Sequence, residues 1–334
     1  MSKRKAPGDP KNLNQDFCDF LIELAEHELN VNRNHFKGQV YKNAARVLAA
    51  HPTRIKSGEE AKHLKGIGKK IALKIDEYLQ TGKLKKLENI HHDDKGNAIK
   101  LLTRVSGIGP AKAAKLVDEG ITSLEDLHKH PEKLTHHQLI GLKYFEDFEK
   151  KIPRNEIEQI ESQIKNQLED IDPKFEVTIC GSYRRGKSES GDIDALITHI
   201  DYNSSIIDKK HKNQVLKTIV DKLMQCHLIT DTLSLGETKF MGTCQLNPSL
   251  PTRRLDIRFV PFDQYYCAVL YFTGSDLFNQ NMRHHALEQG FTLNEYTLRP
   301  LGLTGRSGEP VEILSEKCIF DVIDYPYKSP EERD

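Results

Sequence analysis

Two short segments with strand periodicity flank a glycine-rich turn in the middle of the chain. Phe175–Cys180 and Ile193–Thr198 both alternate in the way that half-buried β-strands do. Between them lies Gly181-Ser182-Tyr183-Arg184-Arg185-Gly186, and Gly191-Asp192-Ile193-Asp194 leads into the second segment. A strand period of two cannot be accommodated by a helix, so this region constrains the fold to contain a β-sheet. Residues two apart share a strand face, so Asp192 and Asp194 are predicted to point together.

The chemistry of this segment suits phosphate groups. A Gly-Ser turn leaves backbone N–H groups free, and Arg184 and Arg185 add positive charge for oxyanions. Paired carboxylates are the ligands that hard divalent cations prefer. On its own, an Asp-x-Asp pair would favour a solvated strand edge. The combination with the turn, the arginines and the flanking strands favours phosphoryl transfer to or from a nucleotide.

A third carboxylate is needed, because two divalent ions held mainly by two aspartates would lack ligands. Asp256 is the best candidate, since it lies in another alternating segment, Arg254–Val260. Its apolar residues would form one face, and Arg254, Asp256 and Arg258 would share the other. A surface ladder of salt bridges is the alternative interpretation of the same pattern.

Composition indicates a charged protein with an ordinary core and an uneven charge distribution. The 334 residues are 37% hydrophobic and 29% charged, with a formal net charge of zero. Residues 1–90 hold about 18 Lys and Arg against about 11 Asp and Glu, roughly +7. We therefore expect a module that binds a polyanion beside an acidic reaction centre.

The cysteine pattern and the hydropathy limit the class of protein. Six scattered cysteines without a C-x-x-C pair predict reduced thiols rather than disulfides or a zinc site. No apolar run approaches the length that spans a bilayer, so no membrane partner is expected. The basic Met1–Lys5 segment is not followed by an apolar one, which argues against a secretory signal; a solvated tail or a nuclear address would fit it.

An internal repeat lies in the helical N-terminal part. Leu64-Lys65-Gly66-Ile67-Gly68 recurs 41 residues later as Val105-Ser106-Gly107-Ile108-Gly109, each time before an alanine-containing helix. The repeat resembles the helix-hairpin-helix motif, in which the turn offers backbone amides to a DNA phosphate. We expect duplex binding without sequence preference. The resemblance implies a monovalent cation, Na⁺ or K⁺, at each turn, held through Lys62, Leu64 and Ile67 and through Thr103, Val105 and Ile108.

Breaks in the pattern predict the domain organisation. Residues 1–10 are expected to be disordered, and helices are expected over Asn14–Gln80 and Ile99–Lys151. Polar residues 91–97 are predicted to be a helix-poor linker, Ile152-Pro153-Arg154 a boundary, and residues 201–213 a polar loop. The fold class expected is multidomain α and α+β, with a helical N-terminal part before a mixed-sheet palm.

Taken together, these motifs resemble the family X DNA polymerases of the nucleotidyltransferase superfamily, and within them the beta type. The resemblance rests on Gly-Ser-x-Arg-Arg-Gly, Gly-Asp-x-Asp, the two hairpins and the run Tyr271-Phe272-Thr273-Gly274-Ser275-Asp276. It spans essentially the whole chain. It implies a lyase domain over 11–90, a DNA-binding subdomain over 91–151, a catalytic palm over 152–262 and a nucleotide-binding subdomain over 263–334.

The resemblance implies template-directed filling of short gaps in base excision repair, without proofreading. Asp192, Asp194 and Asp256 would hold two Mg²⁺, with Mn²⁺ as a substitute, and Asp256 would be the first acceptor of the primer 3′-hydroxyl proton. The expected triphosphate and nucleotide contacts are Lys151, Ser182, Arg185, Gly191, Tyr271, Phe272, Gly274, Asp276 and Asn279. The expected DNA contacts in this part are Arg254, Arg283 and Tyr296, and Arg258 and Glu295 would form a switch near Asp192.

A second activity is implied for the basic N-terminal part, the removal of a 5′-deoxyribose phosphate. Its aldehyde suits a lysine Schiff base, and crowding among lysines lowers the ammonium pKa. By matching position Lys74 would be the nucleophile and Lys70 a substitute, and Lys37, Tyr41 and Lys86 would hold the 5′-phosphate. Phe36 stands where vertebrate members have a histidine. A basic helix that only binds phosphate is the alternative.

The expected partners are gapped or nicked duplex DNA, deoxynucleoside triphosphates and other repair proteins, in a monomer. We expect a nuclear location, which a cytoplasmic pool can accompany. Two other functions remain open at this point. One is a template-independent nucleotidyltransferase, and the other is a non-catalytic DNA-binding scaffold.

Overall fold

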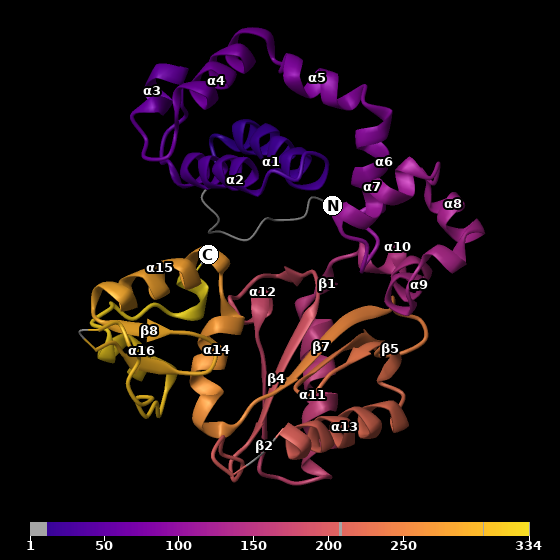
Figure 1. The fold of residues 1–334 in the computed structure, drawn as a ribbon, viewed down its shortest axis with the longest axis vertical. Coiled ribbons are helices and arrows are strands. Elements are labelled where there is room, and N and C mark those ends of the chain that lie inside the picture. Colours follow the sequence, from indigo (N-terminus) through magenta and orange to yellow (C-terminus); the bar gives the residue numbers. More distant parts are fainter. Residues whose placement is uncertain (1–11, 207–208, 303, 334) are drawn as a thin grey trace, which may run out of the picture. The chain divides into compact units, whose positions relative to one another are not determined.

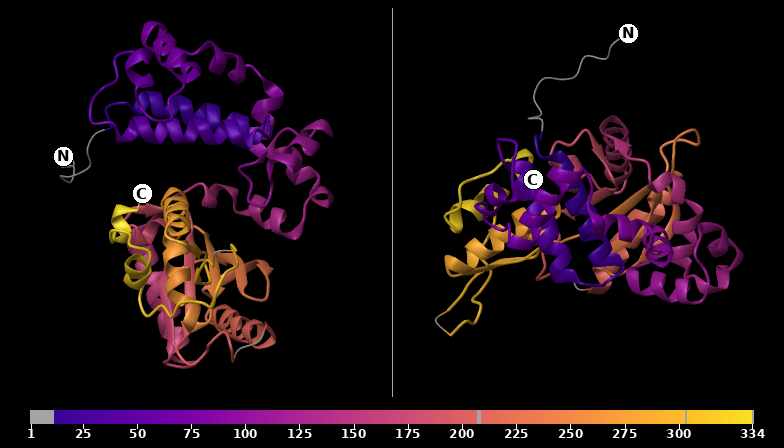
Figure 2. Two further views of the ribbon diagram at one scale, coloured as in Figure 1. Left: turned by 60° about the vertical axis from the view of Figure 1, so that its left-hand side comes forward. Right: turned by 90° about the horizontal axis from the view of Figure 1, so that it is seen from above.

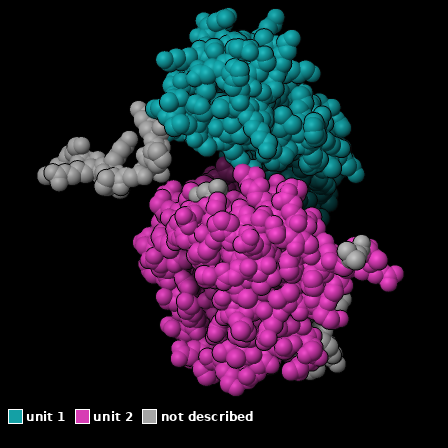
Figure 3. Space-filling model, turned by 90° about the vertical axis from the view of Figure 1, so that its left-hand side faces the viewer, with its two compact units in different colours: residues 1–142 teal, residues 143–334 magenta. Residues whose placement is uncertain are grey.

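The computed structural model describes residues 12–206, 209–302 and 304–333 (Figure 1). The chain forms two compact units, residues 1–142 and 143–334 (Figure 3). Helices build the first unit, and a mixed sheet with helices builds the second, which confirms the predicted α and α+β class. The predicted tail, residues 1–10, lies outside the described residues. No described helix is both long and apolar enough to cross a bilayer.

The first unit is a run of short helices. They are α1 (Gln15–Asn30), α2 (His35–Ala50), α3 (Gly58–Lys62), α4 (Lys69–Thr81), α5 (Lys85–His91), α6 (Asp94–Leu102), α7 (Pro110–Asp118), α8 (Leu124–Lys129), η1 (Pro131–Lys133) and α9 (His136–Lys143), which ends just past the border. Helices α1 and α2 lie side by side (Figures 1 and 2). Their apolar residues recur at spacings of three and four and are buried in one core as predicted: Phe17, Leu21 and Leu24 on α1, and Tyr41, Ala44, Ala45 and Leu48 on α2.

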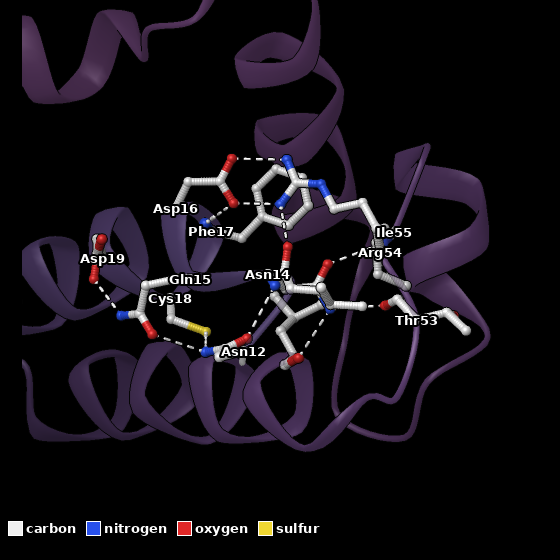
Figure 4. Close-up of polar contacts among 12 residues, drawn as sticks. Asn12, Asn14, Gln15, Asp16, Phe17, Cys18, Asp19, Thr53, Arg54 and Ile55 are labelled. Atoms are coloured by element: carbon white, nitrogen blue, oxygen red, sulfur yellow. Dashed lines mark hydrogen bonds and ion pairs between the residues drawn. The ribbon is translucent and has the colours of Figure 1, made fainter. Parts of the chain in front are cut away.

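Polar contacts fix the beginning of α1 to the segment that follows α2 (Figure 4). Buried Asn14 donates through Nδ2 to the carbonyls of Leu48 and Thr53 and accepts from the N–H of Ile55 through Oδ1. Arg54 pairs with Asp16 and lies over the Phe17 ring, 4.0 Å from its centroid. These contacts satisfy backbone groups that the non-helical connection would otherwise bury unpaired.

The linker predicted over residues 91–97 is not helix-poor. Helix α5 ends at His91 and α6 begins at Asp94, so only two residues separate them. Ala98, Ile99 and Leu102 on α6 are buried, and this packing outweighs the low helix propensity of the preceding polar residues. The end of the loop predicted over 201–213 is also helical, because α13 begins at Lys209; residues 207 and 208 lie outside the described part.

The second unit contains the elements α10 (Phe145–Phe148), β1 (Ile152–Pro153), α11 (Arg154–Glu169), β2 (Phe175–Ile179), α12 (Gly181–Arg184), β3 (Glu189–Ser190), β4 (Ile193–His199), α13 (Lys209–Gln225), β5 (Ile229–Leu235), β6 (Lys239–Cys244), β7 (Arg253–Phe259), η2 (Phe262–Gln264), α14 (Tyr265–Thr273), α15 (Asp276–Glu288), β8 (Phe291–Leu293), β9 (Leu298–Pro300), α16 (Glu316–Val322) and η3 (Pro330–Glu332). Five strands form one sheet in the order β2-β4-β7-β6-β5. Only β4 and β7 pair in parallel; the other neighbours are antiparallel. The three strands predicted around the aspartates are therefore confirmed as β2, β4 and β7.

The two faces of this sheet have different partners. Ile193, Ala195 and Ile197 of β4 belong to the core that α11 and α13 complete. Leu196, on the opposite face, packs with residues of α14. The alternation of β4 therefore places Asp194 on the face shared with Leu196 and away from α11 and α13. A separate apolar cluster joins α14, α15, β8, β9 and α16.

A buried ion pair fixes the start of β7. Arg253 donates through Nε and Nη2 to the two carboxylate oxygens of Glu156 on α11, both at 2.8 Å, and through Nη1 to the Lys150 carbonyl. Both side chains are almost fully excluded from solvent. The pair holds β7, which carries Asp256, against the helix behind the sheet.

Replacing Glu156 with Ala should leave the Arg253 charge buried and uncompensated. We expect the free energy of unfolding of the second unit to fall by about 3–5 kcal/mol, measured by urea denaturation followed by circular dichroism. The control is Glu158→Ala, which removes an exposed carboxylate from the same helix and should change stability by less than about 1 kcal/mol. Equal effects of the two substitutions would contradict this role of the pair.

Candidate active sites

Two of the predicted catalytic aspartates lie next to each other in the sheet. Strands β4 and β7 pair in parallel with Asp194 directly opposite Asp256. Side chains at paired positions share a face, so the two carboxylates emerge together on the side away from α11 and α13. Asp192 precedes β4 by one residue and is exposed. The structure thus brings together three acids that are 64 positions apart at the extremes of the sequence.

The electrostatics of Asp194 show that the three acids act on one another. Burial raises its pKa, and the negative charges of Asp192 and Asp256 raise it further, to about 6. Lys239 and Arg258 oppose this shift only in part. The negative charges of Asp192 and Asp256 destabilise the ionised form of Asp194. A divalent cation bound among the three carboxylates would remove this repulsion.

Two cationic side chains of the protein balance the negative charge of Asp256. Lys239 on β6 lies 2.7 Å from Oδ2, and Arg254 lies 3.2 Å from Oδ1. Among the described residues, no group of three or more His, Cys, Asp or Glu side chains is arranged to hold a metal ion. The donor set nevertheless fits divalent metals, because it consists of neighbouring carboxylates, the ligands that such cations prefer.

The glycine-rich turn lies against Asp194. Gly181 has φ +59°, and a Cβ there would lie 2.8 Å from the Asp194 carboxylate, so only glycine fits. The Ser182 hydroxyl donates to Ser190, and Lys151 lies beside Gly191 with its ammonium exposed to solvent. The turn is therefore built to approach the aspartates closely.

The two arginines of the turn have different surroundings. Arg184 binds the Glu316 carboxylate with two nitrogens and donates to the Thr273 hydroxyl, so its guanidinium is engaged inside the fold. This corrects the expectation that Arg184 serves an incoming oxyanion. Arg185 donates through Nη1 to the Thr273 carbonyl at the end of α14. Both side chains thus join the turn to the segment predicted to bind the nucleotide.

That segment ends α14 and begins α15. Asn279 donates through Nδ2 to the Tyr271 carbonyl at 2.7 Å, Gly274 has φ +70°, and Asp276 lies exposed at the start of α15. The Tyr271 and Phe272 rings meet edge to face. These predicted nucleotide contacts therefore lie close together in the second unit.

The predicted switch residues have other partners in this structure. Arg258 lies over the Phe272 ring, 4.5 Å from its centroid. Glu295 accepts from Arg283, which also lies over the Tyr271 ring. Tyr296 is half exposed. The exchange of Arg258 between Asp192 and Glu295 stays a prediction.

A second cluster of titratable side chains lies in the first unit. Lys37 of α2 and Lys86 of α5 both contact one carboxylate oxygen of Glu28 on α1. Lys86 also faces the buried Tyr41 ring at 5.7 Å. The predicted phosphate contacts are therefore neighbours in space, although two helices supply them.

Lys74 belongs to the same cluster. Burial lowers the pKa of its ammonium, and the positive charges of Lys86, Lys37 and Lys70 lower it further. Its Nζ donates to the Lys70 carbonyl one turn earlier on α4. A lysine with a lowered pKa supplies more free amine near neutrality, as a Schiff base requires. Phe36, beside this cluster in sequence, is 82% exposed.

The two hairpin turns have the same backbone pattern. Ile67 donates to the Leu64 carbonyl at 3.1 Å, and Ile108 donates to the Val105 carbonyl at 3.0 Å. Gly66 and Gly107 have φ +97° and +87°, and Gly68 and Gly109 precede the helices α4 and α7. The sequence repeat is therefore a structural repeat. Lys62 ends α3 and Thr103 follows α6, at equivalent places before each turn.

Sequence reasoning missed two residues of these sites, Lys239 and Glu28. Lys239 lies on β6 two residues before Met241, which pairs with Asp256, so it shares the Asp256 face. The pairing register, which no local pattern reveals, places it there. Of the two lysines that contact Glu28, Lys37 lies on the next helix and Lys86 lies 58 residues further along the chain, and no local pattern around Glu28 indicates these contacts.

The raised pKa of Asp194 predicts a pH-dependent stability. Above about pH 6 its buried charge destabilises the fold, and protonation removes this cost as the pH falls toward the ordinary value of 3.8. With a chelator present, Asp194→Asn should therefore raise the free energy of unfolding at pH 7.5 by about 1–3 kcal/mol and by about a third of that at pH 4.5. Urea denaturation at both pH values measures this. A gain that does not depend on pH, or one shared by the surface substitution Asp201→Asn, would contradict it.

Comparison with protein-family models divides the chain into four matched regions. A helix-hairpin-helix domain matches residues 12–84, the fingers domain of DNA polymerase lambda matches 100–149, the DNA polymerase beta palm matches 151–262, and the DNA polymerase beta thumb matches 268–334. The aspartates and the turn fall in the palm, and Tyr271 to Tyr296 fall in the thumb. Glu28, Lys37 and Lys74 of the lysine cluster fall in the first region, and Lys86 lies two residues beyond it.

Curated relatives agree with these matches. DNA polymerase lambda of Arabidopsis thaliana is 34% identical over 97% of this chain and 63% of its own length, and that of Rattus norvegicus is 33% identical over 94% and 55%. The chain thus spans somewhat over half the length of these relatives. They are of the lambda type, so the sequence-based assignment to the beta type is supported only as far as the family. The matched domains of this chain, from the helix-hairpin-helix through fingers and palm to thumb, are those of the family X DNA polymerases.

Proposed function

We propose that this chain is a template-directed DNA polymerase that fills short gaps in base excision repair. The pairing of Asp194 with Asp256 beside Asp192, in a palm domain, carries this proposal. A non-catalytic scaffold would have no need to keep three acids so close that one of them resists ionisation. The proposed activity is that of a polymerase of the beta type or of the lambda type.

In the proposed reaction the primer 3′-hydroxyl attacks the α-phosphorus of a deoxynucleoside triphosphate, and pyrophosphate leaves. Two Mg²⁺ ions, or Mn²⁺ in their place, would supply charge neutralisation and a lower hydroxyl pKa when bound by Asp192, Asp194 and Asp256. Asp256 would accept the hydroxyl proton. In the free protein Lys239 and Arg254 contact the two oxygens of this carboxylate and balance its negative charge.

The turn and the start of the thumb would position the nucleotide. Ser182, Arg185 and Gly191 would contact the triphosphate, with Lys151 adding charge from the side. The backbone from Tyr271 to Gly274, fixed by Asn279, would crowd a ribose 2′-hydroxyl and so favour deoxyribose. Arg283 and Tyr296 would contact DNA, and the hairpin turns would bind backbone phosphates through amides and a monovalent cation.

We further propose a 5′-deoxyribose phosphate lyase activity in the first unit. The Lys74 amine would condense with the sugar aldehyde and release water. Loss of a C2′ proton would then break the C3′–O3′ bond and free the 5′-phosphate of the next nucleotide, and hydrolysis would restore the lysine. Lys37, Tyr41 and Lys86 would hold the phosphate of the sugar. The protein would act as a nuclear monomer beside other repair proteins.

Removing the proposed proton acceptor should abolish insertion. With Asp256→Ala, single-nucleotide insertion into a gapped duplex should fall by at least about 10³-fold, because both the proton acceptor and a metal ligand are lost. Single-turnover primer extension at several Mg²⁺ concentrations measures it. The control Asp221→Ala removes an exposed acid of α13 and should leave the rate unchanged. An insertion rate near that of the wild type would overturn the three-carboxylate site, and insertion that ignores the template base would favour a template-independent nucleotidyltransferase.

Borohydride should trap a covalent adduct between Lys74 and DNA that carries a 5′-deoxyribose phosphate. We expect Lys74→Ala to reduce trapping by about 10²-fold or more, and we expect Lys70 to account for the trapping that remains. The lowered pKa of Lys74 predicts that the wild type traps at a lower pH than an ordinary lysine would. Peptide mapping identifies the modified residue, and Lys83→Ala is the control on the same basic surface. Undiminished trapping in the double variant Lys74→Ala, Lys70→Ala would refute the assignment.

A further inference from the structure

Glu28 is a buried acid that the reactions proposed above do not use. Its exposed fraction is 1%, in the last turns of α1. Carboxylates are rarely buried so completely, and the carboxyl end of a helix disfavours negative charge. A strong compensating interaction must therefore hold it there.

That interaction comes from two lysines and an amide. Glu28 Oε1 lies 2.6 Å from the Lys37 ammonium and 2.7 Å from the Lys86 ammonium, and Asn32 donates to Oε2 at 3.0 Å. Burial alone would raise the pKa of Glu28, but these hydrogen bonds outweigh it and lower the pKa to about 2. The carboxylate is therefore charged at every pH at which the protein would work.

The Oε1 atom of Glu28 thus binds two ammonium groups that would otherwise repel each other. Both distances end on the same atom, so the two charges lie within about 5 Å of each other, where like charges repel appreciably. The side chains of Lys37 and Lys86 remain 44% and 36% exposed. Each ammonium has three donors and gives one to Glu28, so donors remain for a ligand on the solvent side.

We propose that Glu28 is a positioning residue that makes the Lys37–Lys86 pair selective for a terminal phosphate monoester. A terminal phosphate carries nearly two negative charges and three acceptor oxygens on one atom, which matches two converging ammonium groups. This inference rests on the proposed recognition of the 5′-phosphate. It goes further by assigning the selectivity to a buried anion that lowers the net charge of the site while fixing its geometry.

In this role Glu28 affects the affinity of the site for a DNA end differently from the selectivity of the site for the 5′ group. Without the Glu28 charge the site gains one net positive charge, which favours any DNA end, but the two ammonium groups lose the atom that holds them together. Glu28→Gln should therefore bind a gap with a 5′-hydroxyl as tightly as the wild type or more tightly. The preference for a 5′-phosphate over a 5′-hydroxyl should fall by about tenfold, the equivalent of one charge-assisted hydrogen bond.

Fluorescence anisotropy with the full chain tests this on two labelled single-nucleotide gaps that differ only in the 5′ group. The control Glu23→Gln removes an acid from the same helix, which pairs with His91 and Lys100 instead. It should shift both affinities together and leave the preference intact. Glu28→Asp keeps the charge on a shorter arm that cannot reach both lysines, and it should give an intermediate preference. This variant serves as the second test if Glu28→Gln fails to fold.

The outcomes distinguish this inference from the proposed lyase site. A wild-type preference that Glu28→Gln or Glu28→Asp retains in full would overturn the role of Glu28 and leave the phosphate site standing. Parallel weakening of binding to both gaps would show a merely structural role and would also overturn it. A wild type that does not distinguish the two gaps would refute the proposed phosphate site itself.

Discussion

The parallel pairing of β4 with β7 is the constraint on which the catalytic part of this structure depends. It places Asp194 opposite Asp256 and so brings two negative charges together. The residues around them balance this charge or leave room for it. Lys239 and Arg254 balance Asp256, Gly181 leaves room for the Asp194 carboxylate, and the Arg253–Glu156 pair fixes the start of β7. The sheet is thus held by apolar packing on both faces, and the face that packs against α14 also carries the unfavourable charge.

The two candidate active sites solve opposite electrostatic problems. In the palm, acids accumulate and protein cations balance one of them, so the carboxylates suit a divalent metal and the raised pKa of Asp194 predicts a stability that depends on pH. In the first unit, lysines accumulate and the buried Glu28 balances two of them, while Lys74 is left with a lowered pKa. Each site holds counterions supplied by the protein itself, Lys239 and Arg254 in the palm and Glu28 in the first unit, and part of its charge stays unbalanced.

Local patterns predicted much of the fold. Period-two alternation identified β2, β4 and β7, the periodicity of Phe17 to Leu48 identified α1 and α2, and the glycine repeat identified both hairpin turns. The errors came where packing overrides propensity. Residues 91–97 are polar, yet the burial of Ala98, Ile99 and Leu102 draws most of them into α6. We expected Arg184 to bind a ligand, because nothing near it in the sequence indicates its partner. That partner, Glu316, lies 132 residues further along the chain.

The sequence by itself determined which residue types carry the chemistry, because Asp192, Asp194, the glycine-rich turn and the lysines of α4 are local signals. Only the tertiary structure decided which groups balance them. The β6–β7 register brings Lys239 to Asp256, and the packing of α1, α2 and α5 brings Lys37 and Lys86 to one oxygen of Glu28. The physical reason is that charge balance depends on distances of a few ångströms between residues remote in the chain, and such distances leave no trace in a local pattern.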